Sequence, residues 1–289
     1  MSTSLTGRTP IALTIAGSDS GGGAGIQADL KTMQELGVFG MSAITAITAQ
    51  NSIGVHGVYP VPEEAVAQQI DAVLADIGAD AVKTGMLYSP AITRIVAEAA
   101  ERHRIRRLIV DPVMLAKGGS PLLLAEAIDT LASRLLPLAE LVTPNIPEAC
   151  ALLGLDEVDI RTESDMAEAA RALLRLGPAN VLVKGGHLGG ASGSGVCTDV
   201  LAGAAAREPI FYRSPFHDTP HTHGTGCTLS AAIAAGRAHG LPLPDAIRRA
   251  KTYLDAAIAH AFRTGSGIGT LLHAAHRASS GIAAPVMNG

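Results

Sequence analysis

The feature that most constrains the fold is an alternation of short apolar runs with longer segments of helical periodicity. Six runs fit buried strands, at residues 11–16, 42–48, 81–83, 108–110, 141–143 and 181–184. Between them, apolar residues such as Val66, Ile70 and Val73 recur at about the 3.6-residue period of an amphipathic helix. Strands that alternate with helices favour a parallel sheet. We therefore predict an α/β fold with a doubly wound, mostly parallel central sheet flanked by helices on both faces.

The last third of the chain changes character. A Gly/Ser tract at 189–195 precedes two expected strands, near 196–201 and 210–212, and two helices follow them. We interpret the strands as a small hairpin at the edge of the sheet and the helices as closing elements. With no internal repeat and no disordered linker, residues 11–272 are expected to form a single domain. Residues 1–10 and 273–289 are expected to be flexible ends.

Composition and charge exclude several classes of partner. The 22 Lys and Arg residues are outnumbered by 26 Asp and Glu, and only 3% of residues are aromatic. The chain thus has neither a basic field nor stacking platforms for nucleic acid. No apolar run approaches the ~18 residues of a membrane span, so no membrane partner is expected. Three cysteines at wide spacings without a CxxC motif indicate a reducing compartment, and we expect a cytoplasmic protein.

Ligands of open α/β sheets bind beyond the carboxyl ends of the strands, so the residues after each apolar run are the candidates. The first run leads into a glycine-rich loop at 21–25, which lets backbone approach a ligand and precedes a helix start. The loop matches neither a Walker A motif nor the dinucleotide fingerprint. From its spacing alone, a tight structural turn is as good an interpretation as a ligand site.

A second loop, HTHGTGCT at 221–228, opens an Ala-rich helix that continues to about residue 238. Glycines at a helix N-terminus can direct several N–H groups at one point, which suits the charge of a transferring phosphoryl group. The same position predicts a lowered pKa for Cys227 and makes it a candidate base or polar contact. The alternative is a small core residue. His221 and His223 lack a third metal ligand at a matching spacing, so we interpret them as part of a solvated loop.

Polar residues also follow the later strands, and each of these residues could have either a ligand-binding or a structural role. Asp111 could hold magnesium or cap a turn. Asn145 and Glu148 could act together on an ion or phosphate chain, or form an N-cap with a capping box. Lys184 could contact phosphate oxygens or be a solvated cation at a strand end.

Eight sequence blocks in this order carry a resemblance to a known family. They are ALTIAGSD (12–19), GGAGIQAD (22–29), AITAQNSIG (46–54), KTGML (83–87), VDPVMLAKG (110–118), TPNIPEA (143–149), KGGHL (184–188) and HTHGTGCTLSA (221–231). From about residue 11 to residue 269 the chain resembles the hydroxymethylpyrimidine/phosphomethylpyrimidine kinases of thiamine biosynthesis, in the ribokinase-like superfamily.

The resemblance implies a bifunctional kinase. It would transfer the γ-phosphoryl group of ATP to 4-amino-5-hydroxymethyl-2-methylpyrimidine and then to the resulting monophosphate, with Mg²⁺ as the metal. Separately from the resemblance, we expect a homodimer. Carried over by motif, the substrate-binding residues are Gln50, Gly17, Ala24, Asp29, Met86 and Val113, with Gln50 on the aminopyrimidine edge. The ATP-binding residues are Asn145, Lys184 and Thr225, and the magnesium-binding residues are Asp111 and Glu148.

The same resemblance assigns the anion hole to Gly224, Thr225, Gly226 and Cys227. Sugar kinases of this superfamily usually carry Asp as the base at the place of Cys227. The resemblance therefore implies that Cys227 lies in the site and leaves open whether it acts as a base or positions the substrate. The second transfer needs no alcohol deprotonation, because its nucleophile is a phosphate oxygen.

Two other functions compete with this one. A pyridoxal or pyridoxine kinase would use nearly the same loops, although the Gln50 amide, with a donor and an acceptor, favours an aminopyrimidine edge. A catalytically inactive vitamin- or nucleotide-binding regulator is the second alternative. The intact Asp111, Asn145, Glu148 and Lys184, together with the absence of a DNA-binding module in the sequence, argue against a regulator.

Overall fold

The computed structural model describes residues 8–115, 119, 122–124, 126–156, 159–186, 188, 195–205 and 208–279. Most of the predicted Gly/Ser tract, residues 1–7 and residues 280–289 lie outside the described residues. Residues 273–279, expected in a flexible tail, instead form a turn and a short helix, because Arg277 pairs with Glu35 and the Tyr253 hydroxyl donates to the His273 carbonyl at 2.9 Å.

The described elements alternate along the chain as the sequence predicts. The strands are β1 (Ile11–Asp19), β2 (Phe39–Gln50), β3 (Val55–Pro60), β4 (Ala81–Thr84), β5 (Leu108–Val110), β6 (Leu141–Val142), β7 (Asn180–Lys184), β8 (Val196–Gly203) and β9 (Ile210–Pro215). The α-helices are α1 (Gly25–Glu35), α2 (Glu63–Asp76), α3 (Pro90–Arg102), α4 (Glu126–Thr130), α5 (Ile146–Leu153), α6 (Glu163–Leu173), α8 (Thr225–Ala238), α9 (Leu243–Ala259) and α10 (His276–Ser279). Short helical turns are η1 (Leu131–Leu135), η2 (Leu136–Leu138) and η4 (Leu174–Leu176).

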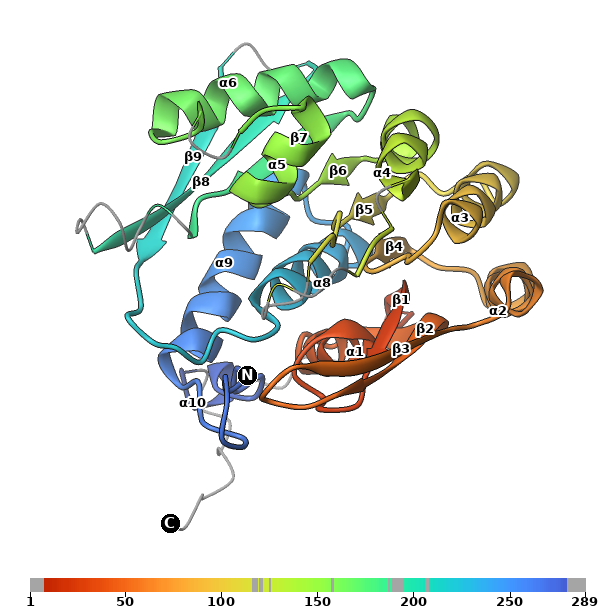
Figure 1. The fold of residues 1–289 in the computed structure, drawn as a ribbon, viewed down its shortest axis with the longest axis horizontal. Coiled ribbons are helices and arrows are strands. Elements are labelled where there is room, and N and C mark those ends of the chain that lie inside the picture. The colour runs from red at the N-terminus through yellow and green to blue at the C-terminus, as the bar shows by residue number, and fades with distance from the viewer. Residues whose placement is uncertain are drawn as a thin grey trace.

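The nine strands form one sheet in the order β3-β2-β1-β4-β5-β6-β7-β8-β9 (Figure 1). Strands β2, β1, β4, β5, β6 and β7 pair in parallel, and β8 and β9 add the predicted antiparallel hairpin at one edge. The predicted doubly wound, mostly parallel sheet is confirmed. Strand β3, antiparallel to β2 at the other edge, was not predicted, because its sequence VHGVYP contains Gly and Pro, which weaken a strand pattern.

Two apolar cores lie on opposite faces of the sheet. Successive residues of β1 alternate between them, since Leu13 and Ile15 pack in the core under α2, α3, α5 and α6, and Ala12 packs in the core under α1, α8 and α9. In α8, every residue from Thr228 to Ala238 except Arg237 is buried. A helix this apolar on all sides has to lie inside the protein, and α8 packs between α1 and α9 against the sheet (Figure 1). Its N-terminus thereby reaches the carboxyl edge of the parallel strands.

Among the described residues, no helix combines the length and the apolar character that crossing a lipid bilayer would require.

Candidate active site

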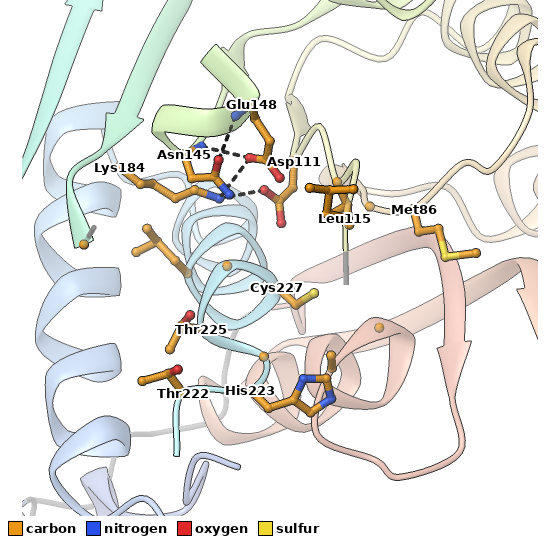
Figure 2. Close-up of a pocket in the computed structure, with 18 of the residues that line it drawn as sticks. Met86, Asp111, Leu115, Asn145, Glu148, Lys184, Thr222, His223, Thr225 and Cys227 are labelled. Atoms are coloured by element: carbon orange, nitrogen blue, oxygen red, sulfur yellow. Dashed lines mark hydrogen bonds and ion pairs between the residues drawn. The ribbon is translucent and has the colours of Figure 1, made fainter. Parts of the chain in front are cut away.

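A cavity of about 920 Å³ opens at the carboxyl edge of the sheet, between the strand ends and the N-terminus of α8 (Figure 2). The parallel direction of β1, β2 and β4 to β7 explains why so many strand ends meet there. The residues that line the cavity include every site residue expected from the sequence except Asp29. They come from segments as far apart in the chain as Gly17 and Ile258.

The glycine loop, residues 21–25, forms one wall, and Asp19 holds it in place. The Asp19 carboxylate accepts hydrogen bonds from the backbone N–H groups of Gly21, Gly23 and Ala24 at 2.8, 3.0 and 2.8 Å. At Gly25, where φ is +57°, a Cβ atom would lie 2.4 Å from the Gly17 carbonyl oxygen, so only glycine fits. The loop is thus both a tight turn and a wall of the cavity, and the two interpretations of the sequence do not exclude each other.

Asp111, Glu148 and Lys184 form a carboxylate–lysine cluster at the end of β5, β6 and β7 (Figure 2). The Lys184 Nζ atom lies 2.9 Å from Asp111 Oδ1 and 3.9 Å from Glu148 Oε2. Asp111 also accepts from the hydroxyls of Thr143 and Ser230 at 3.2 and 3.3 Å. The Asp111 side chain is therefore part of a charged network and not a turn cap, and Lys184 is a paired cation whose side chain is only 14% exposed.

The charges of this cluster shift one another's pKa. Burial raises the pKa of Glu148 to about 7, against the opposing charge of Lys184. Burial alone would also raise the pKa of Asp111, but Lys184 and Lys83 outweigh it and hold that pKa below its usual range. Near neutral pH, the cluster thus combines an ionised aspartate and a lysine with a glutamate that can gain or lose a proton.

The predicted capping box at the start of α5 is confirmed. The Asn145 side chain accepts from the Glu148 N–H at 2.8 Å, and the Glu148 carboxylate accepts from the Asn145 N–H at 2.8 Å. Both residues also line the cavity. The cap and a role toward an ion or phosphate are therefore compatible, because the box fixes the two side chains at the cavity wall.

The N-terminus of α8 faces this cluster across the cavity. Its N-cap, Gly224, has φ of +88°, and a Cβ there would lie 1.8 Å from the Gly23 carbonyl oxygen, so the two loops meet without a side chain between them. A Cβ at Gly226 would lie 3.3 Å from Lys184 Nζ. The first N–H groups of a helix have no acceptor within the helix. This end of α8 can therefore stabilise an anion next to Lys184.

Cys227 lies between the carboxylate–lysine cluster and His223 in the close-up, and this partly exposed residue lines the cavity (Figure 2). Hence it is not a core residue. The expected lowering of its pKa is wrong: burial raises the pKa of the thiol to about 11, although the nearby charge of Lys83 opposes the shift. The loss of hydration outweighs the favourable position at a helix N-terminus.

At the cavity wall, Lys83 of β4 forms an ion pair with Asp29 of α1 that sequence reasoning missed. Lys83 Nζ lies 2.9 and 2.7 Å from the two Asp29 oxygens, and both side chains are 0% exposed. Asp29, expected to bind substrate, does not line the cavity, because its carboxylate points to Lys83 and to the Thr14 hydroxyl at 2.6 Å. A signal was present in the sequence, since Lys83 is a charge within an apolar strand.

On the side of the glycine loop, the cavity is lined by Gly17, Ala24, Gln50, Met86 and Val113. A Cβ at Gly17 would lie 3.1 Å from the Met86 sulfur, so this wall is tightly packed. Together these residues form a mostly apolar recess in which the Gln50 amide is a polar group.

His223 is not part of a solvated loop. Its Nε2 atom lies 2.9 Å from Asp19 Oδ2 and 3.1 Å from the Gln50 amide, and its side chain is only 16% exposed. His221 accepts through Nδ1 from the Gly269 N–H at 3.0 Å. Within the described part of the chain, no three His, Cys, Asp or Glu side chains are grouped to hold a metal ion by themselves.

The far end of the cavity, between β8, β9 and α9, contains a second buried ion pair. Lys251 Nζ lies 2.5 Å from Asp199 Oδ2, and Asp199 Oδ1 accepts from the Gly185 N–H at 3.0 Å. Asp199 thus fixes the backbone directly after Lys184. Sequence reasoning did not single out either partner, although Lys251 lies on the buried face of an amphipathic helix.

Two solved structures with the same fold are kinases. The chain matches pyridoxal kinase of Bacillus subtilis in an ADP complex with a TM-score of 0.84 and 38% identity, over 94% of this chain and 100% of that chain. It matches phosphomethylpyrimidine kinase of Clostridium difficile 630 with a TM-score of 0.73 and 44% identity, over 86% and 99% of the two chains. The fold and the site define a phosphotransferase of the ribokinase-like class.

Sequence comparison narrows this class to one family. The family model described as phosphomethylpyrimidine kinase matches residues 19–272. Hydroxymethylpyrimidine/phosphomethylpyrimidine kinase of Haemophilus influenzae is 48% identical over 264 residues, which cover 91% of this chain and 96% of that protein. The chain belongs to the phosphomethylpyrimidine kinase family, as its sequence blocks indicated.

Proposed function

We propose that the protein is a bifunctional hydroxymethylpyrimidine/phosphomethylpyrimidine kinase. It transfers the γ-phosphoryl group of ATP to the hydroxymethyl oxygen of 4-amino-5-hydroxymethyl-2-methylpyrimidine and then to the monophosphate, giving the diphosphate for thiamine biosynthesis. One observation carries the proposal: a single cavity joins the recess around Gln50 and Met86 to the carboxylate–lysine cluster, with the N-terminus of α8 at its side. The names of the relatives that match nearly the whole chain support the same activity.

In this mechanism, the protein acts by positioning and by neutralising charge. The Gln50 amide binds the aminopyrimidine edge, and Gly17, Ala24, Met86 and Val113 form the walls around the ring. The N–H groups at Gly224, Thr225, Gly226 and Cys227 stabilise the transferring phosphoryl group. Asn145, Lys184 and Thr225 lie along the phosphates of ATP. The Lys184 ammonium next to the start of α8 supports this assignment.

Cys227 holds the hydroxymethyl group in place in this mechanism. A thiol with a pKa of about 11 keeps its proton near neutral pH, so it can hydrogen-bond to the hydroxyl oxygen but is a poor base. A loose phosphoryl-transfer transition state needs little help from a base. The second transfer needs none, since a phosphate oxygen is the nucleophile.

Asp111 and Glu148 would hold Mg²⁺. The residues fit this ion, because Mg²⁺ keeps several waters and takes only one or two carboxylates besides the phosphates of its nucleotide. The two carboxylates flank the same lysine, and the charge of Asp111 raises the pKa of Glu148, so a cation between them would relieve their repulsion. When bound, Mg²⁺ neutralises charge on the phosphates.

We also propose that the enzyme is a cytoplasmic homodimer. Ile47 of β2 and Tyr59 of β3 are cross-strand partners at the edge of the sheet, and both large apolar side chains are exposed, which suits an interface with another chain. Cys197 and Cys227 carry free thiols, as in a reducing compartment. Light scattering of the purified protein measures the assembly directly.

A product assay tests the activity. Purified protein with ATP and Mg²⁺ should convert the hydroxymethylpyrimidine to the monophosphate and the diphosphate, and Lys184→Met should lose both products. Absence of the diphosphate alone would reject the second half of the proposal. Ligand-induced stabilisation without any transfer would favour a binding protein.

Pyridoxal should be assayed in parallel with the hydroxymethylpyrimidine, because a pyridoxal kinase has the same fold, with a TM-score of 0.84. We expect kcat/KM to be higher for the pyrimidine than for pyridoxal. The reverse order would make the protein a vitamin B6 kinase.

A further inference from the structure

Three side chains on the wall of the cavity form one hydrogen-bonded chain. Asp19 Oδ2 lies 2.9 Å from His223 Nε2, and the same His223 atom lies 3.1 Å from the Nε2 position of the Gln50 amide. The Asp19 and His223 side chains are only 4% and 16% exposed. Asp19 and His223 are 204 residues apart in the sequence, so these hydrogen bonds connect the first strand with the loop before α8.

Asp19 decides which atom carries the hydrogen between it and His223. Burial alone would raise the pKa of Asp19, but hydrogen bonds from His223 and from the Ala24 N–H outweigh it and hold that pKa below its usual range. An ionised carboxylate can only accept hydrogen bonds. His223 therefore carries a hydrogen on Nε2 and donates it to Asp19.

This assignment fixes the orientation of the Gln50 amide. A ring nitrogen that donates cannot also accept from an amino group, so the Gln50 amide has to be turned by half a rotation, with its carbonyl oxygen at the position next to His223. That oxygen then shares the Nε2 hydrogen of His223 with Asp19. Thr48 demands the same orientation from the other side. Its hydroxyl lies 2.8 Å from the Ser18 carbonyl oxygen and 3.4 Å from the Oε1 position of Gln50. Because the hydroxyl has one hydrogen and the contact with Ser18 is the shorter, we infer that it donates to Ser18 and accepts at the Gln50 position. The amino group of the turned amide therefore lies at that position.

The ring of His223 has little room to turn away from this arrangement. A Cβ atom at Gly23 would lie 2.5 Å from its Cδ2 atom, which shows how closely the ring packs on the glycine loop. The Thr270 hydroxyl lies 3.4 Å from the His223 carbonyl oxygen and 3.5 Å from that of Gly23. Backbone and side chain of His223 are both held.

We propose that Asp19 and His223 are positioning residues that lock the Gln50 amide, with its oxygen towards His223 and its amino group towards Thr48. The lock decides which donor and which acceptor the enzyme presents to its substrate, and so it sets the preference for an aminopyrimidine edge over a pyridine ring such as pyridoxal. This inference rests on the proposed function, in which Gln50 binds that edge. A free amide could rotate and would fit either pattern.

The kinetic test uses two substitutions at one position. His223→Leu removes the donor, and His223→Gln keeps an N–H group near the place of Nε2. For His223→Leu, we expect KM for the pyrimidine to rise about ten- to a hundredfold and its preference over pyridoxal to fall by a similar factor, the range that follows from an unpaired buried polar group. KM for ATP should stay within about twofold, and His223→Gln should regain most of the preference.

His103→Leu is the matched control. His103 also pairs with an aspartate, Asp71, at 2.7 Å, but both lie on α2 and the end of α3 and do not line the cavity. This variant should match the wild type in all constants. Equal losses in His223→Leu and His223→Gln would show a merely structural role and overturn the proposal, as would an unchanged substrate preference in His223→Leu.

A measurement without substrate separates this inference from the proposed function. In the intact protein with 15N-labelled histidine rings, NMR should show a protonated Nε2 on His223, assigned by its loss in His223→Leu. An unprotonated Nε2 would overturn the locked orientation even if the enzyme is a pyrimidine kinase. A protonated Nε2 in a wild type that phosphorylates no pyrimidine would instead retain the lock and refute the proposed function.

Discussion

Breaking the buried ion pair between Lys83 and Asp29 should cost the protein much of its stability. In Lys83→Met, a side chain of similar length replaces the cation, and the Asp29 carboxylate keeps only the Thr14 hydroxyl as a partner. Both side chains are 0% exposed, so water cannot take the place of the lysine. A buried pair broken on one side loses about 3–5 kcal/mol of unfolding free energy. At about 2–4 °C per kcal/mol, the melting temperature should fall by about 6–20 °C.

The loss of unfolding free energy in Lys83→Met should depend on pH. Burial raises the pKa of Asp29, and without the opposing charge of Lys83 it should rise further. A carboxyl whose pKa is higher in the folded than in the unfolded state stabilises the fold at low pH, and this contribution is lost as pH rises through the folded pKa. The variant should therefore be closest to the wild type in acid and fall further behind it towards pH 8.

Urea unfolding followed by circular dichroism, at several pH values and without ligands, measures this free energy. The double variant Lys83→Met/Asp29→Asn should be more stable than Lys83→Met, because it buries no uncompensated charge. Arg102→Met is the matched control: it breaks an ion pair with Asp71 whose partners are 50% and 44% exposed, and it should cost less than about 1 kcal/mol. If Lys83→Met also loses less than about 1 kcal/mol, the reasoning about burial is refuted.

Three further predictions use other parts of the site. Gly185→Ala should unfold or strongly destabilise the protein in a thermal melt, since a Cβ would lie 2.0 Å from the Thr198 carbonyl oxygen. Gly186→Ala, with open space around it, should melt like the wild type, and equal melting temperatures for the two variants would contradict the close packing of Gly185. Burial raises the pKa of Glu148 from 4.5 to about 7, so its contribution to stability is present below pH 4.5 and is lost as pH rises through 7. Urea unfolding of ligand-free Glu148→Gln should show a flatter pH dependence across that range, and an unchanged slope would reject the shift. Because the pKa of Cys227 is about 11, peptide mapping should find its alkylation by iodoacetamide slow at pH 7 and about tenfold faster with each pH unit up to about 10; fast reaction at pH 7 would indicate a thiolate.

Strand ends were the predictable part of this site. Because parallel strands end at one edge, the residues after each apolar run could be expected to meet, and Gln50, Asp111, Asn145 and Lys184 do line one cavity. The capping-box pattern also predicted how Asn145 and Glu148 bond to each other. Local sequence was sufficient in these cases because the strand or the helix turn itself sets the geometry.

Pairs between distant segments could not be predicted. The contacts of Lys83 with Asp29 and of His223 with Asp19 span 54 and 204 residues and depend on how α1 and the loop before α8 pack against the sheet. The wrong direction for the pKa of Cys227 has the same origin, since the loss of hydration around a thiol is a property of the packed structure.

The packing of Gly224 against Gly23 has a consequence for how the protein is made. The glycine loop is translated early, but the N-terminus of α8, which packs against it, follows about two hundred residues later in the chain. Until α8 has been translated and has packed on the sheet, this wall of the cavity has no opposite side. A nascent or truncated chain that stops before Thr225 would expose the sheet face that α8 covers and would have no complete cavity. We therefore expect substrate and nucleotide to bind the complete fold and not the partly folded chain. Their binding would then stabilise the folded state relative to partly folded states, and more so as their concentrations rise.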